Sequence, residues 1–116
     1  MLAADTSELY FLVDSKGALI AYQQNETSWA GILGFSSEER AREFVKTSGV
    51  ATRDIASISA LDEASIAALI DSVKKRAIRN LILDLDYRTG SCKMIEFEGA
   101  RLGAARDYQF EPKTVR

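Results

Sequence analysis

The sequence has no histidine and a single cysteine, Cys92, in 116 residues. Without imidazole, one chain cannot build a Ser-His-Asp triad, a Cys-His pair, a histidine proton shuttle or the usual zinc site. One thiol also excludes an intrachain disulfide and a cysteine-rich metal cluster. Magnesium and calcium, which take oxygen ligands, are the metals still open to protein side chains. We therefore expect a protein that is not an enzyme and that needs no cofactor.

Long hydrophobic runs are also missing. The apolar stretch 9–13 follows a short polar beginning and is far too short for a signal-peptide core or a membrane span. We therefore expect a cytoplasmic protein without a membrane partner. The net charge of −2 gives no general attraction to nucleic acid phosphates, so nucleic acid is not a favoured partner.

The composition is that of an ordinary folded domain. Hydrophobic residues make up 47% of the chain and charged residues 28%, and proline occurs once. A chain of this length holds one domain, which we place at 1–116, with 1–7 and 112–116 as frayed ends.

Two helices are predicted from their ends and their apolar spacing. Ser36-x-x-Glu39 forms a capping box, and Gly49 is a suitable end for the helix that it opens. Asp62 caps a second helix, in which an apolar stripe recurs at helical spacing. The stripe consists of Ile66, Ile70, Val73 and Ala77.

The remaining apolar segments predict strands, joined in two places by turns. Asp14–Gly17 predicts a hairpin between 8–13 and 18–23, and the turn 87–90 predicts another between 81–86 and 92–98. The order is then β-β-β-α-β-α-β-β in a mixed sheet, an α/β (α+β) domain. Further strands are expected at 29–35 and 55–61, with a last edge strand at Tyr108 and Phe110.

One candidate binding surface surrounds Trp29. Tryptophan is frequent at interaction hot spots, and glycines such as Gly31 and Gly34 in a strand let another backbone or a ligand approach closely. The alternative is a core tryptophan beside a twisted or bulged strand.

A second candidate is the pair Asp84 and Asp86 at the end of a buried strand. Carboxylates at this place can hold magnesium in the crevice where α/β sheets bind ligands. The segment resembles the first motif of haloacid dehalogenase-like phosphatases, but Thr89 stands one residue later than that motif has it. The alternative is two solvated carboxylates beside a turn.

A third candidate is a basic cluster that could contact phosphates. It consists of Lys74, Lys75, Arg76 and Arg79. Cations at a helix C-terminus also stabilise the helix, and the cluster lacks aromatic residues for base stacking. Cys92 is either a thiol activated by Lys93 or a small buried hydrophobe.

Four segments resemble the N-terminal domain of SseB-type proteins: FLVDSKGALIAYQ, WAGILGFSSEERAREFVKTSG, IASISALDEASIAALI and IRNLILDLDYRTG. The helix start of that family is matched by Phe35, Ser36, Ser37, Glu39 and Ala41. The chain departs from the family where Asp84-Leu-Asp86 replaces an Asn-Pro turn. The resemblance implies an α/β domain without enzymatic activity.

The sequence thus favours a small cytoplasmic interaction module. Its contact surface is expected at an exposed sheet edge or around Trp29, and its partner is another protein or a second copy in a homodimer. The alternative is a metal-dependent or nucleotide-binding domain centred on Asp84 and Asp86.

Overall fold

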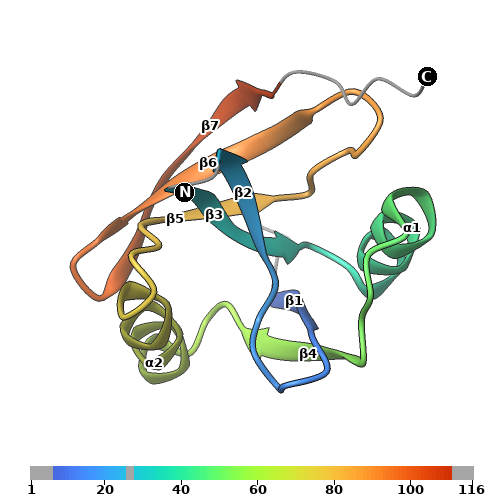
Figure 1. Ribbon diagram of the computed structural model, residues 1–116. Coiled ribbons are helices and arrows are strands. Elements are labelled where there is room, and N and C mark those ends of the chain that lie inside the picture. Colours follow the sequence, from blue (N-terminus) through green and yellow to red (C-terminus); the bar gives the residue numbers. More distant parts are fainter. Residues whose placement is uncertain (1–6, 26–27, 111–116) are drawn as a thin grey trace.

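Seven strands form one mixed sheet with two helices in the computed structural model, which describes residues 7–25 and 28–110 (Figure 1). The order of elements matches the prediction, including the last edge strand. The predicted frayed ends lie outside the described residues, apart from Ser7. The elements are β1 (Glu8–Val13), β2 (Ala21–Asn25), β3 (Ser28–Phe35), α1 (Glu38–Ser48), β4 (Asp54–Ser59), α2 (Glu63–Lys74), β5 (Asn80–Leu83), β6 (Ser91–Glu98) and β7 (Arg101–Gln109).

The strands are arranged in the order β4-β1-β3-β5-β6-β7, and β2 lies beside β3. Strands β3 and β5 are parallel, whereas the other pairs are antiparallel. The predicted second hairpin is present as β5 and β6. The ends of this strand order are β4 and β7, and β2, which pairs with β3 alone, is a further edge strand.

The first predicted hairpin is wrong beyond its turn. Asp14 accepts hydrogen bonds from the backbone N–H groups of Ala18 and Lys16, which lower the pKa of its carboxyl. After a bridge between Val13 and Leu19, however, the chain leaves β1, and β2 runs along β3. Both edges of β1 are occupied by other strands, because β4 pairs along one edge and the end of β3 pairs along the other.

Each helix begins at a capping side chain. Ser37 caps α1 and accepts from Arg40 N–H, one residue later than the predicted capping box, and Gly49 ends the helix with a φ of +71°. Asp62 caps α2 as predicted, and hydrogen bonds from Ser65 and Ala64 lower the pKa of its carboxyl.

The apolar stripe predicted for the second helix is wrong at its last member, Ala77. Ile66, Ile70 and Val73 are buried, but Ala77 is exposed and has a φ of +60°. Ile78 N–H donates to Val73 O and Ala77 N–H to Lys74 O, a pattern that closes a helix with a left-handed residue. The helix therefore ends before the stripe does.

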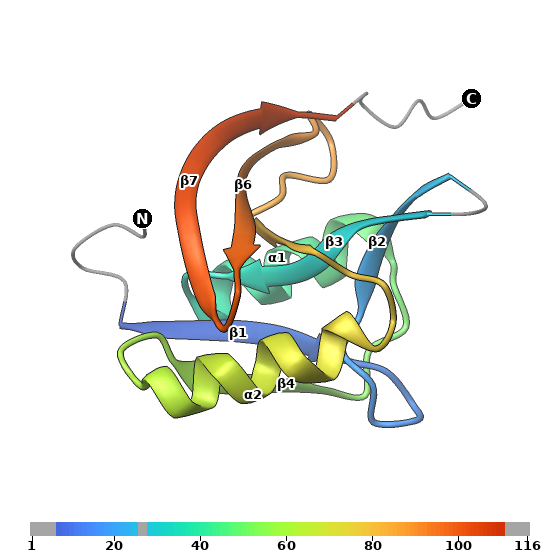
Figure 2. The same ribbon diagram turned by 90° about the vertical axis from the view of Figure 1, so that its left-hand side faces the viewer.

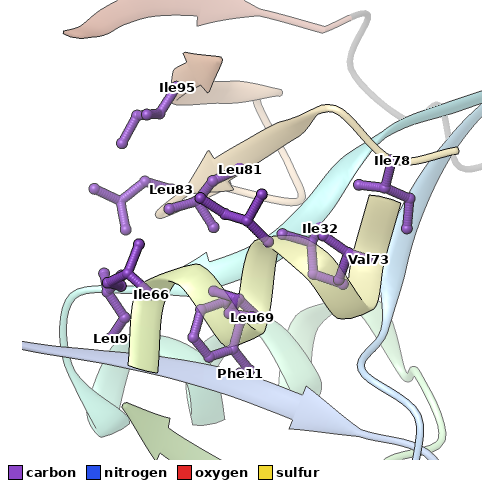
Figure 3. Close-up of a cluster of buried hydrophobic side chains, with 11 residues drawn as sticks. Leu9, Phe11, Ile32, Ile66, Leu69, Val73, Ile78, Leu81, Leu83 and Ile95 are labelled. Atoms are coloured by element: carbon purple, nitrogen blue, oxygen red, sulfur yellow. The ribbon is translucent and has the colours of Figure 1, made fainter. Parts of the chain in front are cut away.

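The helices cover opposite faces of the sheet, as both views show (Figures 1 and 2). Successive residues of β5 point to opposite faces, so Leu81 and Leu83 pack in the cluster beneath α2 and Ile82 packs in the cluster beneath α1. Figure 3 shows the α2 cluster, in which Phe11 and Leu69 lie together. The predicted buried central strand is thus β5, with Asp84 directly after it.

Candidate functional site

Asp84 joins the ends of the two parallel strands. Its carboxylate accepts hydrogen bonds from the backbone N–H of Ser36 at 2.8 Å and from the Ser36 hydroxyl at 2.7 Å. Ser36 directly follows β3, and Asp84 directly follows β5. Because parallel strands end at the same edge of a sheet, the two residues meet there although 48 positions separate them. The carboxylate therefore ties the strand ends together.

Asp86 forms hydrogen bonds with a different segment of backbone, the turn that follows it. Its carboxylate accepts from Arg88 N–H at 2.9 Å, and its own backbone groups bond to Ser91 and Gly90. The two aspartates thus hold a strand junction and a turn, respectively. No group of three or more potential metal-binding Asp, Glu, Cys or His side chains occurs within residues 7–25 and 28–110. The predicted metal site at Asp84 and Asp86 therefore gains no further ligand from the described part of the chain.

A hollow of about 120 Å³ lies beside this junction. Its walls include the rings of Phe44 and Tyr87, whose centroids are 5.8 Å apart, together with Asp84 and Arg88. Pockets for small organic ligands usually enclose about 300 to 1,000 Å³. This hollow is smaller than that range. A second surface depression, of about 420 Å³, has Asp84, Asp86 and Lys93 among its walls.

At Gly31 and Gly34, the atoms that approach closely belong to neighbouring strands of the same chain. A Cβ atom at Gly31 would lie 2.8 Å from Asn80 O, and one at Gly34 would lie 2.7 Å from the Leu81 side chain. Both glycines are buried. They therefore let β3 pack against its own neighbours and offer no surface to a partner. The Trp29 side chain lies outside the described residues, although its backbone pairs with Gln23.

The residues of the basic cluster contact different neighbours. Arg76 donates to Leu19 O at 2.6 Å, Lys74 donates to Gly99 O at 3.3 Å, and Lys75 lies 3.8 Å from Asp71. Arg79 is exposed and directly precedes β5. The cations are therefore spread over different neighbours, and two of them support the backbone.

Cys92 is buried in the cluster beneath α1, and its burial raises the pKa of the thiol to about 11. The thiolate is the reactive form of cysteine, so a raised pKa makes the thiol unreactive at neutral pH. The structure thus favours the buried hydrophobe over the activated thiol.

Cys92 of the folded protein should react slowly with iodoacetamide at pH 7.5 and faster as the pH approaches 11, because the thiolate population grows tenfold per pH unit below the pKa. Mass spectrometry of the labelled protein gives the rate. Urea-unfolded protein is the control, since exposure returns the pKa toward its ordinary value. Equal rates for folded and unfolded protein at pH 7.5 would contradict the assignment.

Strand β4 offers the binding feature that sequence reasoning did not locate. It is the end strand of the sheet and pairs along one edge with β1 (Figure 1). Leu61 lies just after this strand. It is a large hydrophobic residue, yet it is 79% exposed. The signal available in the sequence was the stretch 55–61, which carries no charge.

Comparisons of the chain with protein-family models, with curated proteins and with solved structures found no match. In the described part of the chain, neither helix has the length and apolar character needed to cross a membrane. We therefore infer the function from the geometry of the sheet.

Proposed function

We propose that this chain is a small cytoplasmic protein-interaction module that binds an extended segment of a partner along the outer edge of β4. Addition of a strand to a sheet edge uses main-chain hydrogen bonds and needs no catalytic group. The single observation that supports it is the set of backbone groups that β4 leaves unpaired. One free thiol, which needs no oxidising compartment, supports the cytoplasmic location.

The register with β1 identifies these groups. Ala60 N–H donates to Ser7 O at 2.9 Å, and the same register continues through Ile58↔Leu9 to Asp54↔Val13. In an antiparallel pair, every second residue bonds to the neighbour and the residues between face away. Ile55, Ser57 and Ser59 therefore direct their N–H and C=O groups outward.

Two local contacts agree with this assignment. Ile55 N–H donates to the Asp54 carboxylate at 2.8 Å, and Ser59 O accepts from Asp62 N–H at 3.3 Å. Within the described residues, the outward groups left without a partner are Ile55 O, both backbone groups of Ser57 and Ser59 N–H. These four groups form a template for an incoming strand.

The opposite end of the sheet is protected. Strand β7 carries Arg106 and Asp107, which lie near Glu96 and Lys93, and its register with β6 shifts between Ile95 and Phe97. Charges and bulges on an edge strand discourage pairing with another chain. Strand β4 has a single charged residue, Asp54, at its beginning. The end strands β4 and β7 therefore differ in the property that controls strand addition. A third edge strand, β2, pairs with β3 alone and carries register shifts on either side of Gln23, which also discourage pairing.

The resemblance to SseB-type N-terminal domains agrees with this proposal, because it implies a domain without enzymatic activity. The alternative is a metal- or nucleotide-binding domain at Asp84 and Asp86, both of which line a surface depression of about 420 Å³. Both carboxylates already bond to the chain's own backbone, so we propose the interaction module over this alternative.

Ser57→Pro should abolish strand addition and leave the fold intact. Proline removes the outward N–H and places its ring in the path of the incoming strand, yet it takes no hydrogen bond from the ladder with β1. The test selects phage-displayed random peptides on protein immobilised at low density, so that copies cannot pair with one another. We expect peptides to be enriched on the wild-type protein and not on the proline variant.

Ser57→Ala is the matched control, because it changes the side chain and keeps both backbone groups. It should retain the selected peptides with affinities within about threefold of wild type, a difference below ~1 kcal/mol. Enrichment of the same peptides on Ser57→Pro, or no enrichment on any variant, would overturn the proposed function. Urea unfolding of all three proteins verifies that the fold is kept.

A further inference from the structure

The β4 edge is complementary to itself, and from this we infer that the strand it takes up is β4 of a second copy of this chain. This inference rests on the proposed function and names the partner. The two copies pair antiparallel about a two-fold axis at Ser57, so that Ser57 faces Ser57 and Ile55 faces Ser59 of the second copy. Such an interface uses the same surface of both subunits, as two-fold dimers do.

The unpaired backbone groups match one another in this arrangement. The two Ser57 residues exchange two hydrogen bonds, N–H to C=O in both directions. Ser59 N–H of each copy donates to Ile55 O of the other. The remaining groups of the outer pair are Ile55 N–H and Ser59 O, and these are the two that the chain satisfies internally, through Asp54 and Asp62. Four hydrogen bonds therefore form, and every outward group from 55 to 59 has a partner.

The side chains on the α2 face also fit. Ala56 of each copy faces Ile58 of the other in a non-hydrogen-bonded pair, where side chains approach most closely. Both residues are half-buried in the single chain. A small side chain opposite a large one fills the space without a clash, and pairing removes the exposed parts of both from water.

The ends of the paired strands bring together complementary features. Antiparallel pairing carries the exposed Leu61 of one copy to Arg53, the residue directly before β4, in the other. A surface hollow of about 330 Å³ lies there, with Val45 and Ile55 among its walls. We assign this hollow as the place that receives Leu61.

The charges at these ends have opposite signs. The hollow is lined by the cations Arg42, Lys46 and Arg53 and by one carboxylate, Asp54. Asp62 and Glu63, both exposed, directly follow Leu61 and arrive with it. Each end of the dimer therefore sets two acids against a surface with a net positive charge, and the two-fold axis repeats this match.

The test is site-specific disulfide formation between two copies that also carry Cys92→Ala. In the proposed register, the Cα atoms of the two residues at 57 lie about 5.5 Å apart, within the range that a disulfide spans. The two residues at 59 lie roughly 14 Å apart, since each is two positions from the axis. Ser57→Cys should therefore form a disulfide-linked dimer in oxidised glutathione at least tenfold faster than Ser59→Cys, and the unmodified chain should have twice the mass of a monomer in light scattering.

Equal cross-linking rates for the two cysteine variants would overturn the register, and a monomeric mass over the whole accessible concentration range would overturn the self-pairing. If a monomer still enriches displayed peptides in a manner that Ser57→Pro abolishes, the inference fails while the proposed function holds. If neither dimer nor peptide binding is observed, both fail. A dimer that Ser57→Pro converts to monomer, with Ser57→Ala unchanged, supports both.

Discussion

Asp84→Ala should lower the free energy of unfolding by about 2 to 4 kcal/mol, because it removes a carboxylate that accepts two hydrogen bonds and also places alanine in a left-handed backbone conformation. The φ of Asp84 is +55°, a conformation that aspartate and asparagine tolerate better than alanine does. The loss leaves the Ser36 N–H without its acceptor at the junction of β3 and β5. Urea denaturation followed by circular dichroism measures the change.

Two further variants separate the two causes. Asp84→Asn keeps an oxygen acceptor and suits the backbone, so it should lose about 1 kcal/mol. Asp84→Gly relieves the backbone and lacks the carboxylate, so it should be more stable than Asp84→Ala by about 1 kcal/mol. If Asp84→Ala unfolds at the same urea concentration as the wild type, the junction does not stabilise the fold as described.

Gly90→Ala should lower the free energy of unfolding by about 2 to 5 kcal/mol, through backbone strain and a steric clash together. A Cβ atom at Gly90 would lie 2.3 Å from Phe110 O, and the φ of this glycine is +81°. The clash cannot be relieved by a side-chain rotation, because the atom it meets is backbone. Gly90 O also accepts from Phe110 N–H at 2.9 Å, so the two segments are held close together.

Gly99→Ala is the matched control for the strain alone. Gly99 has a φ of +63°, but a Cβ atom there would meet no atom within 4 Å. Its replacement should therefore lose about 1 to 2 kcal/mol, the ordinary difference for a left-handed residue. The difference between the two variants reports the clash with Phe110. Equal losses at both positions would show that the end of β7 moves away freely.

The first residue of α1 could be predicted from the sequence to within one position. Ser36 and Ser37 are both good capping residues, and the spacing to Glu39 favours Ser36. Ser37 caps the helix, because Ser36 is engaged by Asp84 from a segment 48 residues away. Local spacing predicts that a helix begins here, and a long-range contact selects the residue.

The prediction of the first hairpin is wrong for a related reason. The turn at Asp14–Gly17 depends on neighbouring residues and forms as expected. Which strand occupies each edge of β1 depends on segments that are distant in the sequence, and β4 and β3 take those edges. Gly31 and Gly34 illustrate the same limit, since the sequence indicates a close approach but not that β1 and β5 make it.

The amino-acid order alone determined the succession of strands and helices and the exclusion of histidine chemistry, because periodicity, capping and composition are properties of near neighbours. The tertiary structure decided which strand ends the sheet with free backbone groups, and it placed Asp84 against Ser36. Strand pairing is a competition between distant segments for the same hydrogen-bonding edges, so its outcome becomes visible when the whole sheet is assembled.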